Sequence, residues 1–287
     1  MPVLACGLAT VDVVQVVPHV PTADEKVVAF ATRVESGGPA LNAALTSALL
    51  GMPCRLVTAV GRAPLAAVVR AECAEHDVDL VDLAGDGYEL AVATGLLTLA
   101  TGERAVASTG ALGVEPGAVQ TPSEVDTLLD GVRAVLVDGH HLPVALPLAA
   151  AARARGIPVL ADGGSWKPGL DALLAHVDVL VASADFRSPT GDGVDELLTL
   201  GPTWVARSAG AGAVVWRAAN GAGGQVSPPA VEVADTLGAG DVLHGALLAE
   251  VGRHGTHDLP AALASAVATA SRSVRAPGAR GWAKPGR

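Results

Sequence analysis

The stretch Ala234-Asp235-Thr236-Leu237-Gly238-Ala239-Gly240-Asp241 decides how the rest of the chain is interpreted. A β-branched run at residues 231–233 precedes it and an alanine- and leucine-rich run at 242–249 follows it. This pattern predicts a strand, a glycine turn and a helix. Small residues in such a turn let an anion approach the backbone, where free N–H groups and the helix dipole favour it. The stretch therefore indicates a phosphate site.

Asp241 puts a carboxylate beside this predicted anion site. A carboxylate there would repel a bound phosphate unless it has a chemical role, such as taking the proton of an attacking hydroxyl. The alternative is an ordinary strand-to-helix turn with a capping aspartate. The sequence contains no GxxxxGK[ST] loop, so phosphate binding would depend on the glycine turn before Asp241.

A second glycine turn opens an apolar helix near the start of the chain. Gly37-Gly38-Pro39-Ala40-Leu41-Asn42 begins this helix, which ends before Gly51. Asn42 lies one turn into it, where a side-chain amide can reach a ligand held above the helix start. Asp12 interrupts an apolar run after a predicted strand at 3–8. It is either a surface residue or a site residue at the carboxyl edge of a parallel sheet, where such sheets bind ligands.

These two stretches resemble the signatures of one protein family. DTLGAGD is similar to the C-terminal signature of the ribokinase-like (PfkB) carbohydrate kinases, and GGPALNAALTSALLG is similar to their N-terminal signature. The resemblance implies a ribokinase-like three-layer αβα sandwich with a small β-lid. It implies a kinase that uses ATP and Mg²⁺. It assigns the anion hole to the backbone of Leu237, Gly238, Ala239 and Gly240, the catalytic base to Asp241, and sugar binding to Gly37, Gly38, Asn42 and Asp12.

Within this family the chain looks closest to ketohexokinase-type sugar kinases. The strings CGLATVDVV, VPTADEKV, GGPALNAAL, TGERAV, DVLVASADF and VADTLGAGD follow in the same order. The resemblance implies sugar contacts from Asp24 and Arg104, although Arg104 can also be a solvated hairpin charge. It implies nucleotide contacts from Ser208, Ala209, Gly212, Thr236, Gly238 and Gly240.

The chain also departs from the family pattern. Pro39 stands where a second sugar-binding amide is expected and offers no donor, which suggests a different hydroxyl pattern from fructose. The NxxE motif that helps to hold magnesium reads Ser183-Ala184-Asp185-Phe186, so the metal ligands stay unknown. His244 replaces a common phenylalanine, and we expect this packing change to be tolerated.

Apolar strands that alternate with helices predict a parallel sheet covered on both faces. We expect one domain over residues 1–287, with a lid formed by about 12–35 and 88–110. An alternating segment at 26–30 predicts a short exposed strand, and the alternation at 91–100 and 103–108 predicts a hairpin with Thr101-Gly102 at its turn. By family resemblance the lid strands also form a homodimer interface.

Composition excludes several other classes. The 287 residues carry a net charge of −10 with no basic stripe, which argues against a nucleic-acid partner. No apolar run is long enough for a membrane span. Half of the residues are hydrophobic but only 2% are aromatic, so the core must consist of Ala, Val and Leu. Cys6, Cys54 and Cys73 show no metal-ligand spacing, which favours buried thiols in the reducing cytoplasm.

Two polar groups after predicted strands leave alternatives open. In Asp138-Gly139-His140-His141 the adjacent histidines point to opposite faces of an extended chain, so we favour a nucleotide-lining residue over a shared metal. Asp162 could belong to the magnesium–phosphate network or cap the helix predicted at 167–175.

The sequence therefore predicts a cytoplasmic kinase that phosphorylates a primary hydroxyl of a small sugar, in the first place a ketose. A nucleoside, an aldose, a sugar phosphate or a sulfosugar stays open as the acceptor. So does a non-catalytic protein that binds sugar or nucleotide.

Overall fold

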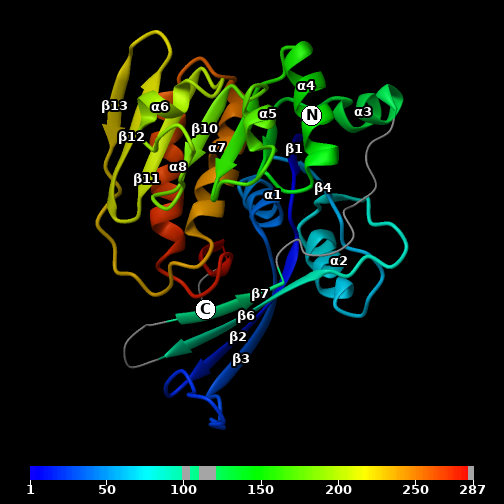
Figure 1. The fold of residues 1–287 in the computed structure, drawn as a ribbon, viewed down its shortest axis with the longest axis vertical. Coiled ribbons are helices and arrows are strands. Elements are labelled where there is room, and N and C mark those ends of the chain that lie inside the picture. Colours follow the sequence, from blue (N-terminus) through cyan, green and yellow to red (C-terminus); the bar gives the residue numbers. More distant parts are fainter. Residues whose placement is uncertain (99–103, 110–120, 284–287) are drawn as a thin grey trace.

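A computed structural model describes residues 1–98, 104–109 and 121–283 of the chain. Its centre is a nine-stranded sheet with the order β13-β12-β11-β10-β9-β8-β1-β4-β5 (Figure 1). The strands of this large sheet are β1 (Val3–Cys6), β4 (Cys54–Thr58), β5 (Asp79–Asp82), β8 (Val135–Val137), β9 (Val159–Gly163), β10 (Val179–Ala182), β11 (Trp204–Ala209), β12 (Gly212–Ala218) and β13 (Gly223–Val226). From β5 to β11 all neighbours are parallel, while β12 and β13 are antiparallel.

Helices cover both faces of the large sheet. One face packs against α1 (Pro39–Leu49), α2 (Ala66–Glu75), α7 (Ala239–His254) and α8 (Leu259–Ser273). The other packs against α3 (Pro122–Leu129), α4 (Leu142–Ala154), α5 (Leu170–Leu174) and α6 (Val194–Leu198). Along β1, Val3 and Ala5 enter the first core, while Leu4 and Cys6 enter the second. Because successive side chains of a strand point to opposite faces, a fully apolar strand supplies both cores.

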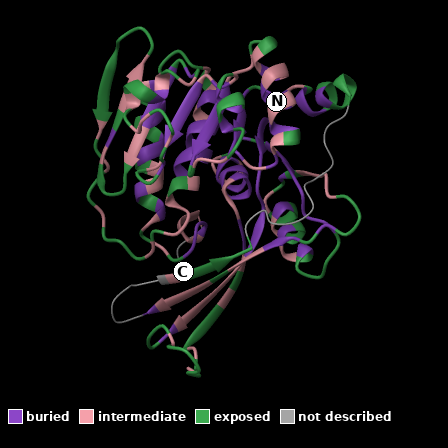
Figure 2. Cartoon of the chain, viewed as in Figure 1, coloured by how far each residue is buried: buried purple, intermediate pink, exposed green. Residues whose placement is uncertain are grey.

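Four further strands form a separate small sheet with the order β3-β2-β6-β7. They are β2 (Thr10–Val17), β3 (Ala31–Gly37), β6 (Ala91–Thr98) and β7 (Arg104–Ser108). This small sheet extends away from the large one, and most of its residues are half-buried or exposed (Figure 2). The hairpin predicted at 91–108 is present as the antiparallel pair β6–β7. Its predicted turn residues, Thr101 and Gly102, lie outside the described residues.

Two predicted strands are wrong. Residues 26–30 form an irregular segment, and the strand begins at Ala31 instead. Val28 and Phe30 in this segment are 80% and 66% exposed, so their alternation matches no buried face. Residues 231–233 likewise form no strand before the glycine turn. Val233 is 58% exposed. The last strand before this segment is β13, which already forms the edge of the large sheet.

Two smaller expectations are also settled by the structure. Asp162 does not cap the helix after β9, because α5 begins at Leu170 behind Gly169 and has no side-chain cap. Cys6, Cys54 and Cys73 are free, buried thiols, as predicted.

Among the described residues, no helix combines the length and apolarity that crossing a membrane would need. Helix α3, which the sequence reading missed, begins with a capping box between Thr121 and Glu124.

Candidate active site

The glycine turn stands at the start of α7, the longest helix of the described chain. Gly238 has a φ of 74°, and a Cβ there would lie 2.7 Å from the Cβ of Ala279, so only glycine fits. A Cβ at Gly240 would meet nothing within 4 Å. The first backbone N–H groups of α7 have no partner within the helix and carry the positive end of its dipole. The start of α7 therefore offers N–H donors where the sequence predicts an anion site.

Asp241 lies in the first turn of α7 and contacts α1. Its Oδ2 accepts a hydrogen bond of 2.7 Å from Nδ2 of Asn42. Burial is the main cause that raises the pKa of Asp241 to about 7, and the nearby carboxylate of Asp162 adds to it. The Asn42 hydrogen bond and His244 act in the opposite direction. A carboxylate with a pKa near neutrality is suited to proton transfer at physiological pH.

His244 joins α7 to the large sheet. Its Nδ1 lies 2.7 Å from the carbonyl oxygen of Gly240, and its Nε2 lies 3.0 Å from that of Val181. Carbonyl oxygens only accept, so a ring nitrogen that bonds to one of them is the donor. Nδ1 is also 3.4 Å from Oδ2 of Asp162. His244 therefore contributes a polar bridge where the sequence suggested only a packing change, and Asp162 faces the site instead of capping a helix.

A cavity of about 210 Å³ opens in front of Asp241. Its polar lining comes from Thr10, Asp12, Glu35, Ser36, Asn42, Asp241 and Arg280. Burial raises the pKa of Asp12, whose Oδ1 accepts a hydrogen bond of 2.8 Å from the hydroxyl of Thr10. The cavity thus unites Asp12, Asn42 and Asp241, which the sequence analysis took from three separate stretches of the chain.

The glycine pair makes room for this lining. A Cβ at Gly37 would collide with the carboxylate of Asp12, which lies across the β2–β3 ladder. Gly38 has a φ of 96°, and a Cβ there would lie 2.5 Å from the carbonyl oxygen of Leu8. Pro39 is the first residue of α1, where its missing N–H costs no hydrogen bond.

Arg280 and Glu72 belong to the site region but were missed by the sequence reading. Arg280 is 9% exposed, and its side chain forms an ion pair with Glu72 of α2. It also donates hydrogen bonds of 2.6 Å to Oδ1 of Asn42 and to the carbonyl oxygen of Ser36. Neither residue stands in a motif, so the only sequence signal was the Pro-Gly turn at 277–278 that follows the last long helix.

Several predicted site residues are not among the residues that line this cavity. Asp24 is exposed in the turn between β2 and β3, with a φ of 63°. Arg104 is the first residue of β7 and pairs with Leu97, but its side chain lies outside the described part of the structure. Ser208 and Ala209 end β11 and Gly212 begins β12, so they lie at the carboxyl edge of the large sheet. Thr236 accepts the N–H of Ala239 through its carbonyl oxygen at 3.3 Å.

Asp138 connects three segments at the same edge of the large sheet. Its carboxylate accepts hydrogen bonds from the backbone N–H groups of Leu8, Ala40 and His140 at 2.8, 3.2 and 2.9 Å. Burial lowers the pKa of His140, which also faces Lys167. Within the described ranges no group of three or more His, Cys, Asp or Glu side chains could hold a metal ion. Asp138 is therefore a structural connector between β1, α1 and β8.

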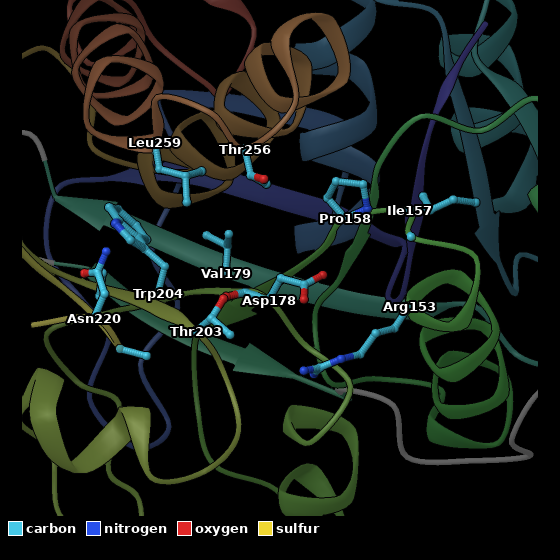
Figure 3. Close-up of a pocket in the computed structure, with 13 residues that line it drawn as sticks. Arg153, Ile157, Pro158, Asp178, Val179, Thr203, Trp204, Asn220, Thr256 and Leu259 are labelled. Carbon is cyan, nitrogen blue, oxygen red and sulfur yellow. The ribbon is translucent and has the colours of Figure 1, made fainter. Parts of the chain in front are cut away.

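A larger hollow of about 510 Å³ lies at the opposite edge of the large sheet (Figure 3). Its charged lining is already used by the fold. Asp178 accepts the N–H of Val159 at 2.9 Å, and Arg153 donates to the carbonyl oxygen of Ala175 at 2.8 Å. None of the predicted site residues lines it. The smaller cavity beside Asp241 is therefore the candidate site.

Comparisons with known proteins agree with this fold. The profile of the pfkB family of carbohydrate kinases matches residues 2–285. No curated protein sequence matches the chain. Among solved structures, ribokinase from Arabidopsis thaliana, complexed with ribose and ATP, superposes with a TM-score of 0.79 at 20% identity, covering 96% of this chain and 93% of that one.

Two further structures are similar to the same extent. Ribokinase from Giardia lamblia gives a TM-score of 0.81 at 16% identity, with 98% of this chain and 95% of that chain covered. Fructokinase with bound ATP from Xylella fastidiosa gives 0.75 at 20% identity, with 97% and 93% covered. At these identities the likeness establishes a ribokinase-like fold.

Proposed function

The chain belongs to the pfkB family of carbohydrate kinases, and from this premise we propose that it transfers the γ-phosphoryl group of ATP to a primary hydroxyl of a small sugar, in the first place a ketose. The observation that carries the proposal is the position of Asp241. Its carboxylate has a pKa raised to about 7, lies at the start of α7 and opens onto a cavity of about 210 Å³.

In the proposed reaction the acceptor hydroxyl lies between Asp241 and the glycine turn. Asp241 takes the hydroxyl proton as the oxygen attacks the γ-phosphorus. The backbone N–H groups of residues 238–241 and the dipole of α7 stabilise the charge on the transferred group. Asp12 and Asn42 orient the sugar, so much of the rate enhancement comes from positioning. Because the described residues contain no metal-binding cluster, we assign magnesium no protein ligands.

The lining of the cavity supports a neutral, monosaccharide-sized acceptor. Its volume is below the range of about 300–1,000 Å³ that is usual for drug-sized ligands. The carboxylates of Asp12, Glu35 and Asp241 face it, and the cation of Arg280 is already paired with Glu72. Carboxylates accept hydrogen bonds from sugar hydroxyls and repel phosphate or sulfate groups. A neutral sugar is therefore favoured over a sugar phosphate or a sulfosugar.

We place the nucleotide between the glycine turn and the β11–β12 connection. Ser208, Ala209 and Gly212 lie at the carboxyl edge of the large sheet, the edge where Asp138 and Asp162 follow or end their strands. Open α/β sheets bind ligands at this edge. The two similar structures that contain ATP support this choice of phosphoryl donor.

The test is release of ADP from Mg-ATP across a panel of ketoses, aldoses, nucleosides and sulfosugars. We expect turnover on a neutral sugar, and we expect Asp241→Asn to lower kcat by about 10²–10⁴-fold, the usual contribution of a general base. ATP binding by the same variant, measured by calorimetry, is the control for folding. Full turnover by Asp241→Asn would contradict the base assignment. ATP binding without turnover on any acceptor would favour a non-catalytic binding protein.

A further inference from the structure

A continuous chain of side chains connects helix α2 to Asp241. Glu72 of α2 pairs with Arg280, Arg280 donates to Oδ1 of Asn42, and Nδ2 of Asn42 donates to Asp241. The last two bonds measure 2.6 and 2.7 Å. We propose that Arg280 is a positioning residue that fixes the orientation of the Asn42 side-chain amide and so directs its N–H group at Asp241. This inference rests on the proposed role of Asp241 as the base.

The orientation of the Asn42 amide follows from what each neighbouring group can donate or accept. A guanidinium has only donors, and an ionised carboxylate has only acceptors. The Asn42 amide lies between the two, so its oxygen must face Arg280 and its nitrogen must face Asp241. A reversed amide would put two donors together on one side and two acceptors on the other. Without Arg280, only the hydrogen bond to Asp241 constrains the orientation of the amide.

Arg280 is itself held firmly in place. Gly278, two residues earlier, has a φ of 73° and donates its N–H to Oδ2 of Asp235 at 3.0 Å. Asp235 belongs to the same stretch as the glycine turn, and its Oδ1 accepts the N–H of Leu237 at 2.9 Å. The guanidinium also donates to the carbonyl oxygen of Ser36, just before the glycine pair. Arg280 is thus tied to both glycine turns, which suits a residue that sets their relative geometry.

The amide orientation has a consequence for the sugar. An amide nitrogen carries two hydrogens, and one of those on Asn42 is used by Asp241. The second hydrogen can be donated to a sugar hydroxyl in the cavity that Asn42 lines. With the amide fixed, one side chain can therefore contact both the catalytic base and the sugar.

The groups that face Asp241 come from several elements. Asp162 lies at the end of β9 and Asp138 follows β8, and both raise its pKa, while His244 of α7 and the Asn42 hydrogen bond of α1 lower it. Asp12 and Arg280 line the same cavity. Loss of a well-directed Asn42 donor should therefore raise the pKa of Asp241.

The experiment is a titration of Asp241 by carbon-13 NMR of protein labelled at the aspartate carboxyl carbons, with the signal assigned by its loss in Asp241→Asn. We expect Arg280→Met to raise the pKa of Asp241 by about half a unit to one unit. In an Asn42→Ala background the same substitution should cause no further shift, because the amide through which it acts is gone. The pH profile of kcat should move to higher pH in parallel.

Two controls separate this role from a general effect on folding. Arg55→Met removes a similar arginine, which pairs with Asp79 at 2.7 Å and donates to the carbonyl oxygens of Thr127 and Leu128, and should leave the titration unchanged. Glu72→Gln combined with Arg280→Met avoids an unpaired Glu72 and should show the same shift as Arg280→Met alone.

The proposal fails if Arg280→Met leaves the pKa of Asp241 unchanged. It also fails if the shift persists in the Asn42→Ala background, since Arg280 would then act directly through its charge. The NMR titration needs no substrate, so it decides this proposal even if no acceptor in the panel is phosphorylated.

Discussion

At the scale of single residues, the site depends on the carboxylate of Asp241, whose pKa lies close to neutrality. Burial and Asp162 raise the pKa of Asp241 from its usual 3.8 to about 7. The deprotonated form is the one that can take a proton from the acceptor. Activity and stability should therefore respond to pH in opposite directions around neutrality.

Activity should rise with pH through the pKa of Asp241. We expect kcat to fall about tenfold per pH unit below about 7 and to reach a plateau above it, because only the ionised base is active. The measurement is kcat at saturating ATP and acceptor between pH 5.5 and 9. A profile that is flat from pH 5.5 to 8 would show that Asp241 is not the titrating base.

Stability should show the opposite trend. The pKa of Asp241 is higher in the folded state than in the unfolded state, so its contribution is most favourable below about pH 4 and is lost as the pH rises through about 7. Asp241→Asn removes this cost and should raise the unfolding free energy by about 1–3 kcal/mol at pH 8. Thermal unfolding at pH 8 and pH 5 measures it. A gain that is as large at pH 5 as at pH 8 would contradict this origin.

The residue scale also shows what a single sequence can and cannot predict. Asp241, Asn42 and Asp12 were found because each stands in a glycine turn or follows a strand. Arg280 was not found, since its contact with Asn42 spans 238 positions and no local pattern encodes it. His244 was identified but undervalued, because its two carbonyl partners become visible only when α7 is packed on the large sheet.

At the scale of elements, the site depends on close contact between α1 and α7. A Cβ at Gly245 of α7 would collide with the carbonyl oxygen of Ala43 and lie 2.7 Å from the Cβ of Thr46. The hydroxyl of Ser47 donates to the carbonyl oxygen of Gly245 at 2.8 Å. This contact brings the helix that carries Asn42 against the helix that carries Asp241.

Gly245→Ala should therefore destabilise the protein although alanine is the better helix former. We expect a loss of about 1–3 kcal/mol, the usual cost of overpacking, measured by denaturant unfolding. Gly240→Ala is the matched control for stability, because a Cβ there meets open space in the same helix. Equal stability of Gly245→Ala and the wild type would show that the two helices can separate at little cost.

Sequence patterns predicted the helices and strands more completely than the contacts of single residues. The parallel strands and their covering helices follow from apolar runs alternating with helical periodicity, and the structure confirms them. The strands predicted at 26–30 and 231–233 were wrong. An alternating or β-branched pattern indicates a strand only where a neighbouring strand is available for pairing.

At the scale of the whole molecule, polar contacts of β3 join the small sheet to the large body. Arg33 of β3 lies 3.4 Å from Asp235, beside the glycine turn. We propose that the small sheet acts as a lid over the site. Four apolar residues on or beside this sheet are at least half exposed: Val28, Phe30, Val34 and Val106. Such exposed apolar side chains indicate an interaction surface, and we propose a homodimer formed through it.

Phe30→Asp should weaken this dimer, because it would bury a charge in an apolar contact. Sedimentation velocity over a range of concentrations should show a dimer for the wild type and a shift to monomer for the variant. Leu65→Asp, at another apolar residue that is 41% exposed, is the control and should leave the association unchanged. A monomeric wild type, or a variant that dimerises equally well, would exclude this interface.

The contact between Arg280 and Asn42 also bears on how the protein is made. A ribosome adds Arg280 238 residues after Asn42, so during most of synthesis the amide has no partner that fixes its orientation. The residues of the first glycine turn are then already present, but the Asn42 amide lacks the donor that would fix its orientation. The amide should therefore take up its fixed orientation only after the segment beyond α8 has left the exit tunnel, as a late event in biosynthesis.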